Sequence, residues 1–198
     1  MRVTVVDLGV GNIPNVLRAL HRLGAEVTLA THPEEVAQGN VLVLPGVGAA
    51  PPAVRALEDR GLGAALREAV SRGAWLLGIC LGHQLLFEEL QEFGVHRGLG
   101  LLPGVVAPMP CDVLPHIGWA RLEAVRPGFS TLQGRWFYFV HSFAAYPQEE
   151  HLLATAEHRG HRFCAAVRRG RVVGVQFHPE KSGPFGAAFL REFLEMAA

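Results

Sequence analysis

The first half of the chain alternates short apolar runs with segments in which apolar residues recur at helical spacing. Apolar runs predict strands at residues 2–7, 26–30, 41–44 and 75–79. Helical spacing predicts helices between them, at residues 13–23, 53–57 and 62–70. This alternation favours a parallel sheet with right-handed crossovers, and hence an α/β fold.

The second half has a different pattern, because short strand-like segments between residues 101 and 177 are separated by prolines. Residues 168–171, Arg-Arg-Gly-Arg, predict a hairpin turn, and residues 186–196 predict a closing helix. The sequence contains no internal repeat and no low-complexity linker. We therefore expect the later strands to extend or cover the same sheet, within a single domain over residues 1–198.

Composition narrows the classes of function. Of 198 residues, 49% are hydrophobic, which is enough for a buried core, and 18 basic residues balance 18 acidic ones. A formal net charge of +0 gives no electrostatic reason to expect nucleic acid or an anionic membrane as partner. No apolar run approaches the roughly 18 to 20 residues that span a bilayer.

The cysteines lie at positions 80, 111 and 164, an odd number without the short spacings of a zinc or disulfide framework. We expect a reducing cytoplasm, no metal and no cofactor. His158 and His161 flank Gly160 without a third ligand nearby, so we interpret them as a solvated turn and not as a metal site.

One cysteine stands at a predicted junction between a strand and a helix. Gly78 and Gly82 flank Cys80, between the apolar run 74–77 and a helix-like segment at residues 85–90. Such a turn resembles a nucleophile elbow, in which the amides that open the helix favour a thiolate. A free cysteine is more often an inert buried residue, so this motif alone leaves both interpretations open.

A histidine and a carboxylate near the other end of the chain favour the catalytic interpretation. The strand-like run 171–177 leads into His178, Pro179 and Glu180. A cysteine nucleophile needs a histidine to accept its proton, and that histidine needs a carboxylate to orient it. In extended chain, residues two apart lie on one face, so His178 and Glu180 are predicted to face Cys80 together.

These motifs, Gly-Ile-Cys-Leu-Gly-His-Gln and Gln-Phe-His-Pro-Glu, resemble those of class I (triad) glutamine amidotransferases. Four further segments resemble the glutaminase subunits of imidazole glycerol phosphate synthase: residues 7–13, 45–48, 115–119 and 138–142. The resemblance extends from residue 7 to residue 181. It implies a flavodoxin-like fold with a central, largely parallel sheet, and a cysteine that hydrolyses the side-chain amide of L-glutamine.

The resemblance also implies roles for residues around the triad. Backbone amides of the loop with Val47 and Gly48, together with that of Leu81, are expected to form the oxyanion hole. The residues expected to hold glutamine are Gly48, Gln84, Glu92, His141, Ser142 and Phe143. His83 follows Cys80 by three residues, so we expect it to point away from the thiol and brace the elbow.

Relatives in this subfamily use a surface to contact a (β/α)8-barrel cyclase subunit, to which ammonia passes. The positions implied for that surface are Asn12, Asn15, Trp119, Tyr138 and Lys181. Two positions depart from the subfamily pattern, since Asn15 replaces a common serine and Ala120 a common asparagine. Lys181 is the only lysine in the chain.

The predicted function is therefore that of a glutaminase subunit in histidine biosynthesis, paired with the cyclase in a heterodimer. A glutaminase subunit of anthranilate or aminodeoxychorismate synthase is an alternative, disfavoured by residues 115–119. Two further alternatives are a free-standing γ-glutamyl hydrolase and a catalytically idle interaction subunit, the latter disfavoured by the intact triad motifs.

Overall fold

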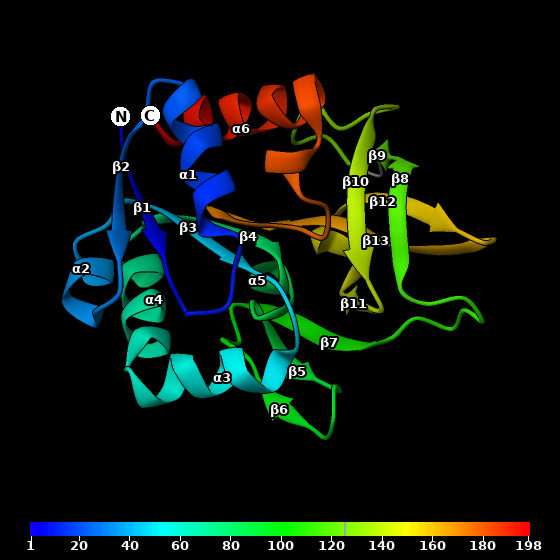
Figure 1. The fold of residues 1–198 in the computed structure, drawn as a ribbon, viewed down its shortest axis with the longest axis horizontal. Coiled ribbons are helices and arrows are strands. Elements are labelled where there is room, and N and C mark those ends of the chain that lie inside the picture. The colour runs from blue at the N-terminus through cyan, green and yellow to red at the C-terminus, as the bar shows by residue number, and fades with distance from the viewer. Residues whose placement is uncertain (125) are drawn as a thin grey trace.

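The computed structural model describes residues 1–124 and 126–198 and is organised around an eight-stranded mixed sheet (Figure 1). Its strand order is β2-β1-β3-β4-β14-β13-β12-β9. The parallel part consists of β2 (Glu26–Ala30), β1 (Arg2–Val6), β3 (Val41–Gly46), β4 (Trp75–Cys80) and β14 (Val172–Val175). The antiparallel extension consists of β13 (His161–Arg169), β12 (Leu152–His158) and β9 (Glu123–Ala124).

Helices cover both faces of the parallel part. In Figure 1, α1 (Ile13–Arg22) and α6 (Gly183–Ala197) lie above the sheet, and α3 (Ala50–Asp59) and α4 (Leu62–Ser71) lie below it. The remaining helical elements are α2 (Pro33–Ala37), α5 (Leu81–Gln84) and the 3-10 turns η1 (Glu149–His151) and η2 (Pro179–Lys181). Two apolar cores result, one with Leu20 and Phe193 and the other with Leu57 and Leu66. Because both faces are covered, the central strands β3, β4 and β14 are apolar at nearly every position.

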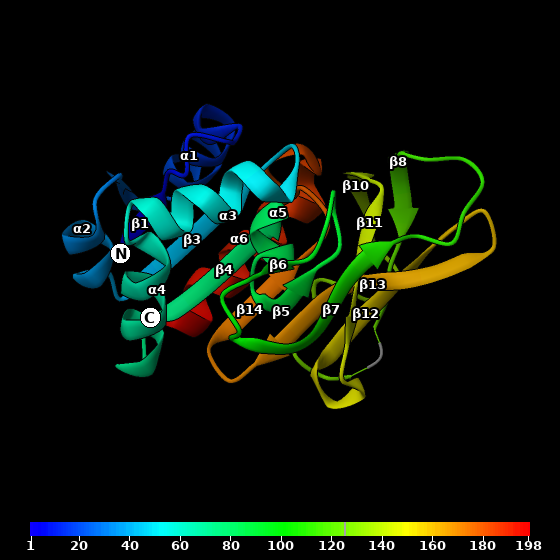
Figure 2. The ribbon, with the colours of Figure 1, turned by 90° about the horizontal axis from the view of Figure 1, so that it is seen from below.

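Two smaller sheets flank the main one. The first pairs β8 (His116–Arg121) with β10 (Trp136–His141), antiparallel. The second has the order β11-β7-β5-β6, formed by β11 (Phe143–Pro147), β7 (Leu102–Pro108), β5 (Phe87–Leu90) and β6 (His96–Arg97). Figure 2, seen from below, shows β5 and β7 beside the central strands, on the side where α3 and α4 lie.

The predicted α/β fold is confirmed. Each of the four predicted strands in the first half matches an observed strand to within two residues at either end. The hairpin predicted at residues 168–171 joins β13 to β14, which pair antiparallel. The later strands extend the sheet, as expected.

The helix predicted at residues 85–90 is wrong. The helical segment after Cys80 is α5, which ends at Gln84, and Phe87–Leu90 forms strand β5. Phe87 and Leu90 are fully buried, and β5 hydrogen-bonds with β7 on one side and β6 on the other. This tertiary pairing outweighs the local preference of three leucines and two glutamates for a helix.

The carboxyl ends of three parallel strands meet at one edge of the sheet. Gly46 at the end of β3 pairs with Cys80 at the end of β4, and β14 runs alongside β4 up to Val175. Loops that follow these strands therefore converge, as ligand-binding loops do in open α/β sheets. Within residues 1–124 and 126–198, no helix combines the length and the apolar character needed to cross a membrane.

Candidate active site

Cys80 occupies a strained turn between β4 and α5. Its φ is 53° and its ψ is −108°, in the region that residues with a side chain rarely adopt. The positive φ belongs to the cysteine itself and not to the flanking glycines Gly78 and Gly82. This geometry is typical of a nucleophile elbow, which exposes a side chain at the end of a strand.

The flanking glycines serve close packing. A Cβ on Gly78 would lie 2.6 Å from the carbonyl oxygen of Gly82, and one on Gly82 would overlap the carbonyl oxygen of Leu44. Gly46 is similarly tight, since its Cβ would lie 3.0 Å from that of Leu81. The three glycines therefore let α5 press against the ends of β3 and β4.

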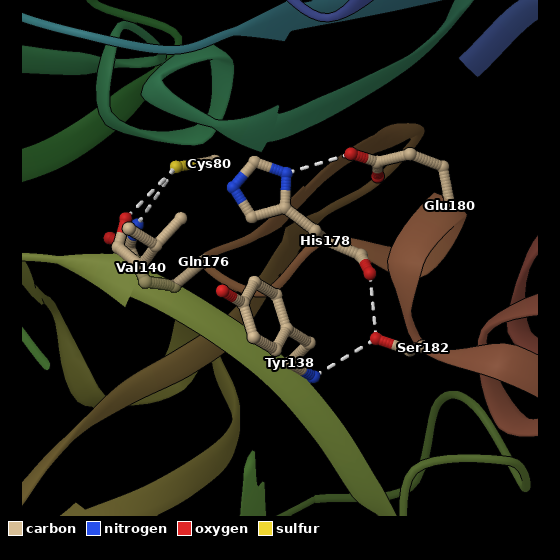
Figure 3. A network of polar contacts seen from close by, with 7 residues as sticks. All are labelled: Cys80, Tyr138, Val140, Gln176, His178, Glu180 and Ser182. Atoms are coloured by element: carbon tan, nitrogen blue, oxygen red, sulfur yellow. Dashed lines mark hydrogen bonds and ion pairs between the residues drawn. The ribbon is translucent and has the colours of Figure 1, made fainter. Parts of the chain in front are cut away.

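His178 and Glu180 form a buried pair beside the thiol. The Nδ1 atom of His178 lies 2.8 Å from Oε1 of Glu180, and the two side chains are 1% and 2% exposed. The other ring nitrogen, Nε2, is turned toward Cys80 (Figure 3). Among the described residues it has no hydrogen-bond partner, so it is free to exchange a proton with the thiol.

The surroundings of His178 favour its charged form. Burial lowers its pKa, but the hydrogen bond to Glu180 and the proximity of Cys80 and Glu180, whose charges favour the imidazolium, outweigh burial and raise the pKa of His178 to about 10. The imidazolium is thus the stable form near neutral pH. A protonated histidine next to a cysteine stabilises a thiolate.

Two neighbours besides the histidine contact the sulfur. The Cys80 thiol donates toward the carbonyl oxygen of Val140 at 3.9 Å, and Nε2 of Gln176 donates to Sγ at 3.7 Å (Figure 3). The sequence analysis did not identify either residue. The predicted strand alternation does not bring His178 and Glu180 together, because Glu180 lies in the 3-10 turn η2, which returns its carboxylate to His178. Gln176 lies two positions before His178 and directly after β14.

A pocket of about 270 Å³ opens over Cys80. The structure brings together in its lining every residue predicted for the oxyanion hole and for substrate: Val47, Gly48, Leu81, Gln84, Glu92, His141, Ser142 and Phe143. Cys80 and His178 also line it, while Glu180 stands behind His178. Gly48 has a φ of 89°, which a glycine adopts without strain.

Gln84 and Glu92 reach the pocket from different elements. Gln84 is the last residue of α5, and its Nε2 donates to Phe143 O at 3.2 Å and to Oε1 of Gln176 at 3.0 Å. Glu92 follows strand β5, and its Oε2 accepts a hydrogen bond from the Ala50 amide at 2.6 Å. Gln84 therefore has both amide hydrogens engaged by the protein and its oxygen available to a ligand.

A second group of histidines supports the pocket wall. His141 Nδ1 lies 2.9 Å from Phe143 O, so it donates there, and its Nε2 accepts from Nδ1 of His116 at 3.3 Å. The ring of His158 stacks on His116 at 4.3 Å, and its Nε2 lies 3.0 Å from Val113 O. His158 and His161 do flank a turn, since they pair across the hairpin between β12 and β13, but the ring of His158 is half-buried against a neighbouring strand and is not fully solvated. His161 is exposed.

The pKa values of the neighbouring buried histidines are shifted in the opposite direction to that of His178. Burial, reinforced by His158, lowers the pKa of His116 to about 4. Burial also lowers the pKa of His141 to about 4, against the hydrogen bond to Phe143 O. His83 is completely buried, packs edge-on against Phe87, and has its pKa lowered by burial to about 3. All three are neutral near pH 7.

The residues implied for a partner surface fall into two neighbouring groups. Tyr138 pairs with Trp119 across β10 and β8, with ring centroids 6.0 Å apart, and Lys181 Nζ lies 5.8 Å from the centre of the Tyr138 ring. Asn12 precedes α1, whose Asn15 accepts a hydrogen bond from Arg18, and α1 packs against η2. Trp119 is 51% exposed, which is unusual for a large aromatic side chain.

Hydrogen bonds to backbone groups join this surface to His178. His178 N donates to Tyr138 O at 2.9 Å, and Ser182 Oγ accepts from Tyr138 N at 3.0 Å while donating to His178 O at 2.6 Å (Figure 3). Ser182 therefore connects η2 to β10 through hydrogen bonds. Its role was not predicted from the sequence. In the part of the chain that the structure describes, no group of three or more His, Cys, Asp or Glu side chains is placed to hold a metal ion.

Comparisons with known proteins agree with this geometry. The family model described as glutamine amidotransferase class-I matches residues 4–197. Two relatives named imidazole glycerol phosphate synthase subunit HisH are similar over almost their whole length. That of Synechococcus sp. (strain JA-3-3Ab) is 42% identical over 100% of this chain and 95% of its own, and that of Moorella thermoacetica 43% over 98% and 94%.

Among solved structures, a glutamine amidotransferase superposes with a TM-score of 0.80 at 25% identity, covering 98% of each chain. PurLQS from Thermotoga maritima also gives 0.80, at 17% identity, which shows the fold alone. The chain belongs to the class-I glutamine amidotransferase family.

Proposed function

We propose that this protein is the glutaminase subunit of imidazole glycerol phosphate synthase, which hydrolyses L-glutamine and delivers ammonia to a cyclase subunit. The observation that carries the proposal is the convergence of Cys80, His178 and Glu180 from separate elements at one pocket, with the histidine and the carboxylate 2.8 Å apart. The relatives of the same name, at 42–43% identity over nearly their full length, support the choice of pathway.

The chemistry follows from these three side chains. With the proton of Cys80 held on Nε2 of His178, the thiolate Sγ attacks the δ-carbon of glutamine. His178 then protonates the departing nitrogen, ammonia leaves, and a γ-glutamyl thioester remains. Water, deprotonated by His178, cleaves the thioester to release glutamate and regenerate the thiol. Glu180 orients the ring and stabilises its positive charge throughout.

Backbone amides around the sulfur supply the oxyanion hole. Leu81 N opens α5, where first-turn amides have no acceptor within the helix, and the loop with Val47 and Gly48 lines the pocket opposite. Donors aimed at the oxyanion typically contribute a factor of about 10² to 10³ each. Because Gly48 carries a positive φ, rotation of its peptide bond to aim an amide is easy for this loop.

The substrate is held by charge and by fixed acceptors. The carboxylate of Glu92 and the free Oε1 of Gln84 suit the α-ammonium group of glutamine. The backbone of Gly48 and of residues 141–143 suits its α-carboxylate and side chain. Contacts to both the α-ammonium and the α-carboxylate give an amino-acid substrate a single orientation, with its carboxamide over Cys80.

The partner in this proposal is a (β/α)8-barrel cyclase that binds at Asn12, Asn15, Trp119, Tyr138 and Lys181 and forms a heterodimer with this chain. The exposed aromatic side chains Trp119 and Trp136 favour such an interface. The chain would act as one glutaminase domain over residues 1–198. Three cysteines without a disulfide fit the reducing cytoplasm, where we place the complex.

Replacing the nucleophile tests the proposal. With Cys80→Ala or Cys80→Ser, the complex should lose glutamine-dependent synthesis of imidazole glycerol phosphate and retain ammonia-dependent synthesis. Cys111→Ser is the matched control, because Cys111 lies outside the pocket lining. An equal loss of both activities would contradict the role of Cys80. A glutamine-derived chloroketone should label Cys80 in preference to Cys111 and Cys164, as measured by peptide mapping.

The need for a partner separates this proposal from a free-standing γ-glutamyl hydrolase. The isolated chain should hydrolyse glutamine slowly, and the rate should rise by orders of magnitude with the cyclase and its ribonucleotide ligand. Each factor of ten requires only about 1.4 kcal/mol, so re-aiming one oxyanion donor is sufficient. Full activity of the isolated chain would favour the hydrolase instead.

A further inference from the structure

Gln176 is a polar residue in an otherwise apolar part of the chain. It is 0% exposed, and its neighbours Val175 and Phe177 are equally buried. Burying a primary amide is costly unless its groups are hydrogen-bonded. Both ends of this amide have partners: Oε1 accepts from Gln84, and Nε2 donates to Sγ of Cys80.

The orientation of this amide follows from its surroundings. The carbonyl oxygen of Phe143 can only accept, so Gln84 must direct its NH₂ group there. The same NH₂ group meets Gln176, which must therefore present its oxygen to Gln84. Nε2 of Gln176 is thereby directed at the sulfur (Figure 3). Flipping either amide would oppose two donors or two acceptors.

The three neighbours of the sulfur differ in whether they accept a hydrogen bond from it, exchange a proton with it or donate a hydrogen bond to it. Val140 O accepts the thiol hydrogen and would repel a thiolate, whereas His178 exchanges a proton with the sulfur during turnover. Gln176 is uncharged and does not titrate, so it donates in every protonation state of the site. Hydrogen bonds to an ionised acceptor are roughly twice as strong as those to a neutral one. Its bond therefore strengthens whenever the sulfur carries charge.

We propose that Gln176 is a further catalytic residue, which donates a hydrogen bond to the Cys80 sulfur and stabilises it as a thiolate. The inference rests on the proposed glutaminase function. Gln176 acts at two points in the reaction. The first comes before the S–C bond forms, once the thiol proton has moved to His178. The second comes when water has attacked the thioester and the C–S bond breaks. At the second point the sulfur leaves with the electron pair.

Two substitutions with similar volume separate this role from a structural one. Gln176→Glu keeps an oxygen to accept from Gln84 but loses the donor toward sulfur. Gln176→Met fills the same space without either group. Thr155→Val is the control. It removes the buried hydroxyl of Thr155 in β12, which has no hydrogen-bond partner among the described residues. A Cys111→Ser background leaves Cys80 as the reactive thiol, because burial raises the pKa of the Cys164 thiol far above its ordinary value.

The first readout is the pH dependence of Cys80 alkylation by iodoacetamide in the isolated chain. We expect its midpoint to rise by about one unit or more in both Gln176 variants and to remain unchanged in Thr155→Val. The second readout is steady-state glutaminase activity with the cyclase subunit. We expect kcat/KM to fall about 30-fold, mainly through kcat, which corresponds to about 2 kcal/mol.

Three results would overturn the inference. The first is a midpoint within 0.3 units, roughly the precision of a titration, and kcat/KM within about threefold of the control in both variants, a difference of only ~0.6 kcal/mol. The second is a loss that appears only in Gln176→Met and only in KM, which would mean that Gln176 merely supports Gln84. The third is a downward shift of the midpoint. If instead the parent chain neither hydrolyses glutamine with the cyclase nor reacts at Cys80, the proposed function itself fails.

Discussion

The end of β14 and the small β8–β10 sheet both place buried histidines near the same pocket. The pKa values of these histidines are nevertheless shifted in opposite directions. His178 is 1% exposed, His116 4% and His141 6%. The pKa of His178 rises to about 10, whereas those of His116 and His141 fall to about 4. The difference is the partner, because His178 faces a carboxylate and a thiol, whereas His141 faces the carbonyl oxygen of Phe143 and His116 faces the rings of His141 and His158.

This contrast gives each region a distinct task. A histidine whose charge is stabilised can hold and return the proton of Cys80. A neutral histidine has one donor and one acceptor in fixed positions, so it can orient backbone without changing charge near neutral pH. His141 and His116 therefore hold the segment 141–143 that lines the pocket, and His178 exchanges protons.

Removing the carboxylate should have the largest effect. In Glu180→Gln, we expect kcat for glutamine hydrolysis by the complex to fall by about 10³- to 10⁴-fold, as carboxylate-to-amide changes do in related triads. The amide keeps the shape but neither stabilises the imidazolium nor fixes the tautomer. NMR titration should show the pKa of His178 shifting toward those of His116 and His141. A loss below tenfold would contradict the role of the pair.

Acid should destabilise the fold through the neutral histidines. Their folded pKa values, about 4 for His116 and His141 and about 3 for His83, lie below the ordinary 6.5, so the unfolded chain binds more protons between these values. The unfolding free energy should therefore fall as pH drops from 6.5 toward 4, with each group adding up to about 1.4 kcal/mol per unit. Urea unfolding at several pH values measures this slope.

A matched pair of variants assigns the slope to burial. His83→Leu should flatten it, whereas His161→Gln should not, because His161 is exposed. His178 has the opposite sign: its raised pKa contributes stability that is fully present below pH 6.5 and is lost as pH rises through about 10. Unfolding free energy that is constant between pH 6.5 and 4 would contradict the neutral state of the three histidines.

A smaller effect is expected from the histidine that supports His141. His116→Phe keeps the ring stacked against Phe139 and His158 but removes the donor to His141 Nε2. A hydrogen bond of this kind contributes about 1 kcal/mol, so KM for glutamine should rise about fivefold with little change in kcat. A fall in kcat at constant KM would assign His116 to the chemical step and remove the contrast with His178.

The smallest effect is expected at the surface next to η2. Lys181 is exposed and lies over the Tyr138 ring, a contact worth about 0.5 to 1 kcal/mol. Lys181→Ala should leave the isolated chain unchanged and weaken cyclase-stimulated turnover by up to about fivefold. Arg191→Ala, an exposed cation on α6, is the control. Stimulation and affinity within about twofold of the unmodified complex would contradict an interface role for Lys181.

The prediction of elements succeeded where a segment's pattern matched its own environment. Residues 41–44 form a continuous apolar run that is buried in the middle of the sheet, and residues 62–70 have apolar positions at helical spacing that are buried on one side of the helix. It failed at residues 85–90, where Phe87 and Leu90 satisfy a helix as well as a short strand. Only the pairing of β5 with β7 and β6 distinguishes the two, and those partners are not local.

The same division applies to the site. Cys80, His178 and Glu180 were predicted from the sequence because their chemistry requires these residue types, and the spacing of His178 and Glu180 is local. Gln176, Ser182 and His116 were missed. Each acts through a contact with a residue far away in the chain or through its backbone, which residue type does not reveal.

The sequence by itself determined the α/β class, the order of the elements and the chemical type of the nucleophile, since apolar period and side-chain chemistry are local properties. The tertiary structure decided the charges. Burial and the partners of each ring set the pKa of His178 above 6.5 and those of His83, His116 and His141 below it. Glu180 and Phe143 are local partners, but Cys80 lies near His178, and His116 near His141, only because the folded sheets bring these distant segments together.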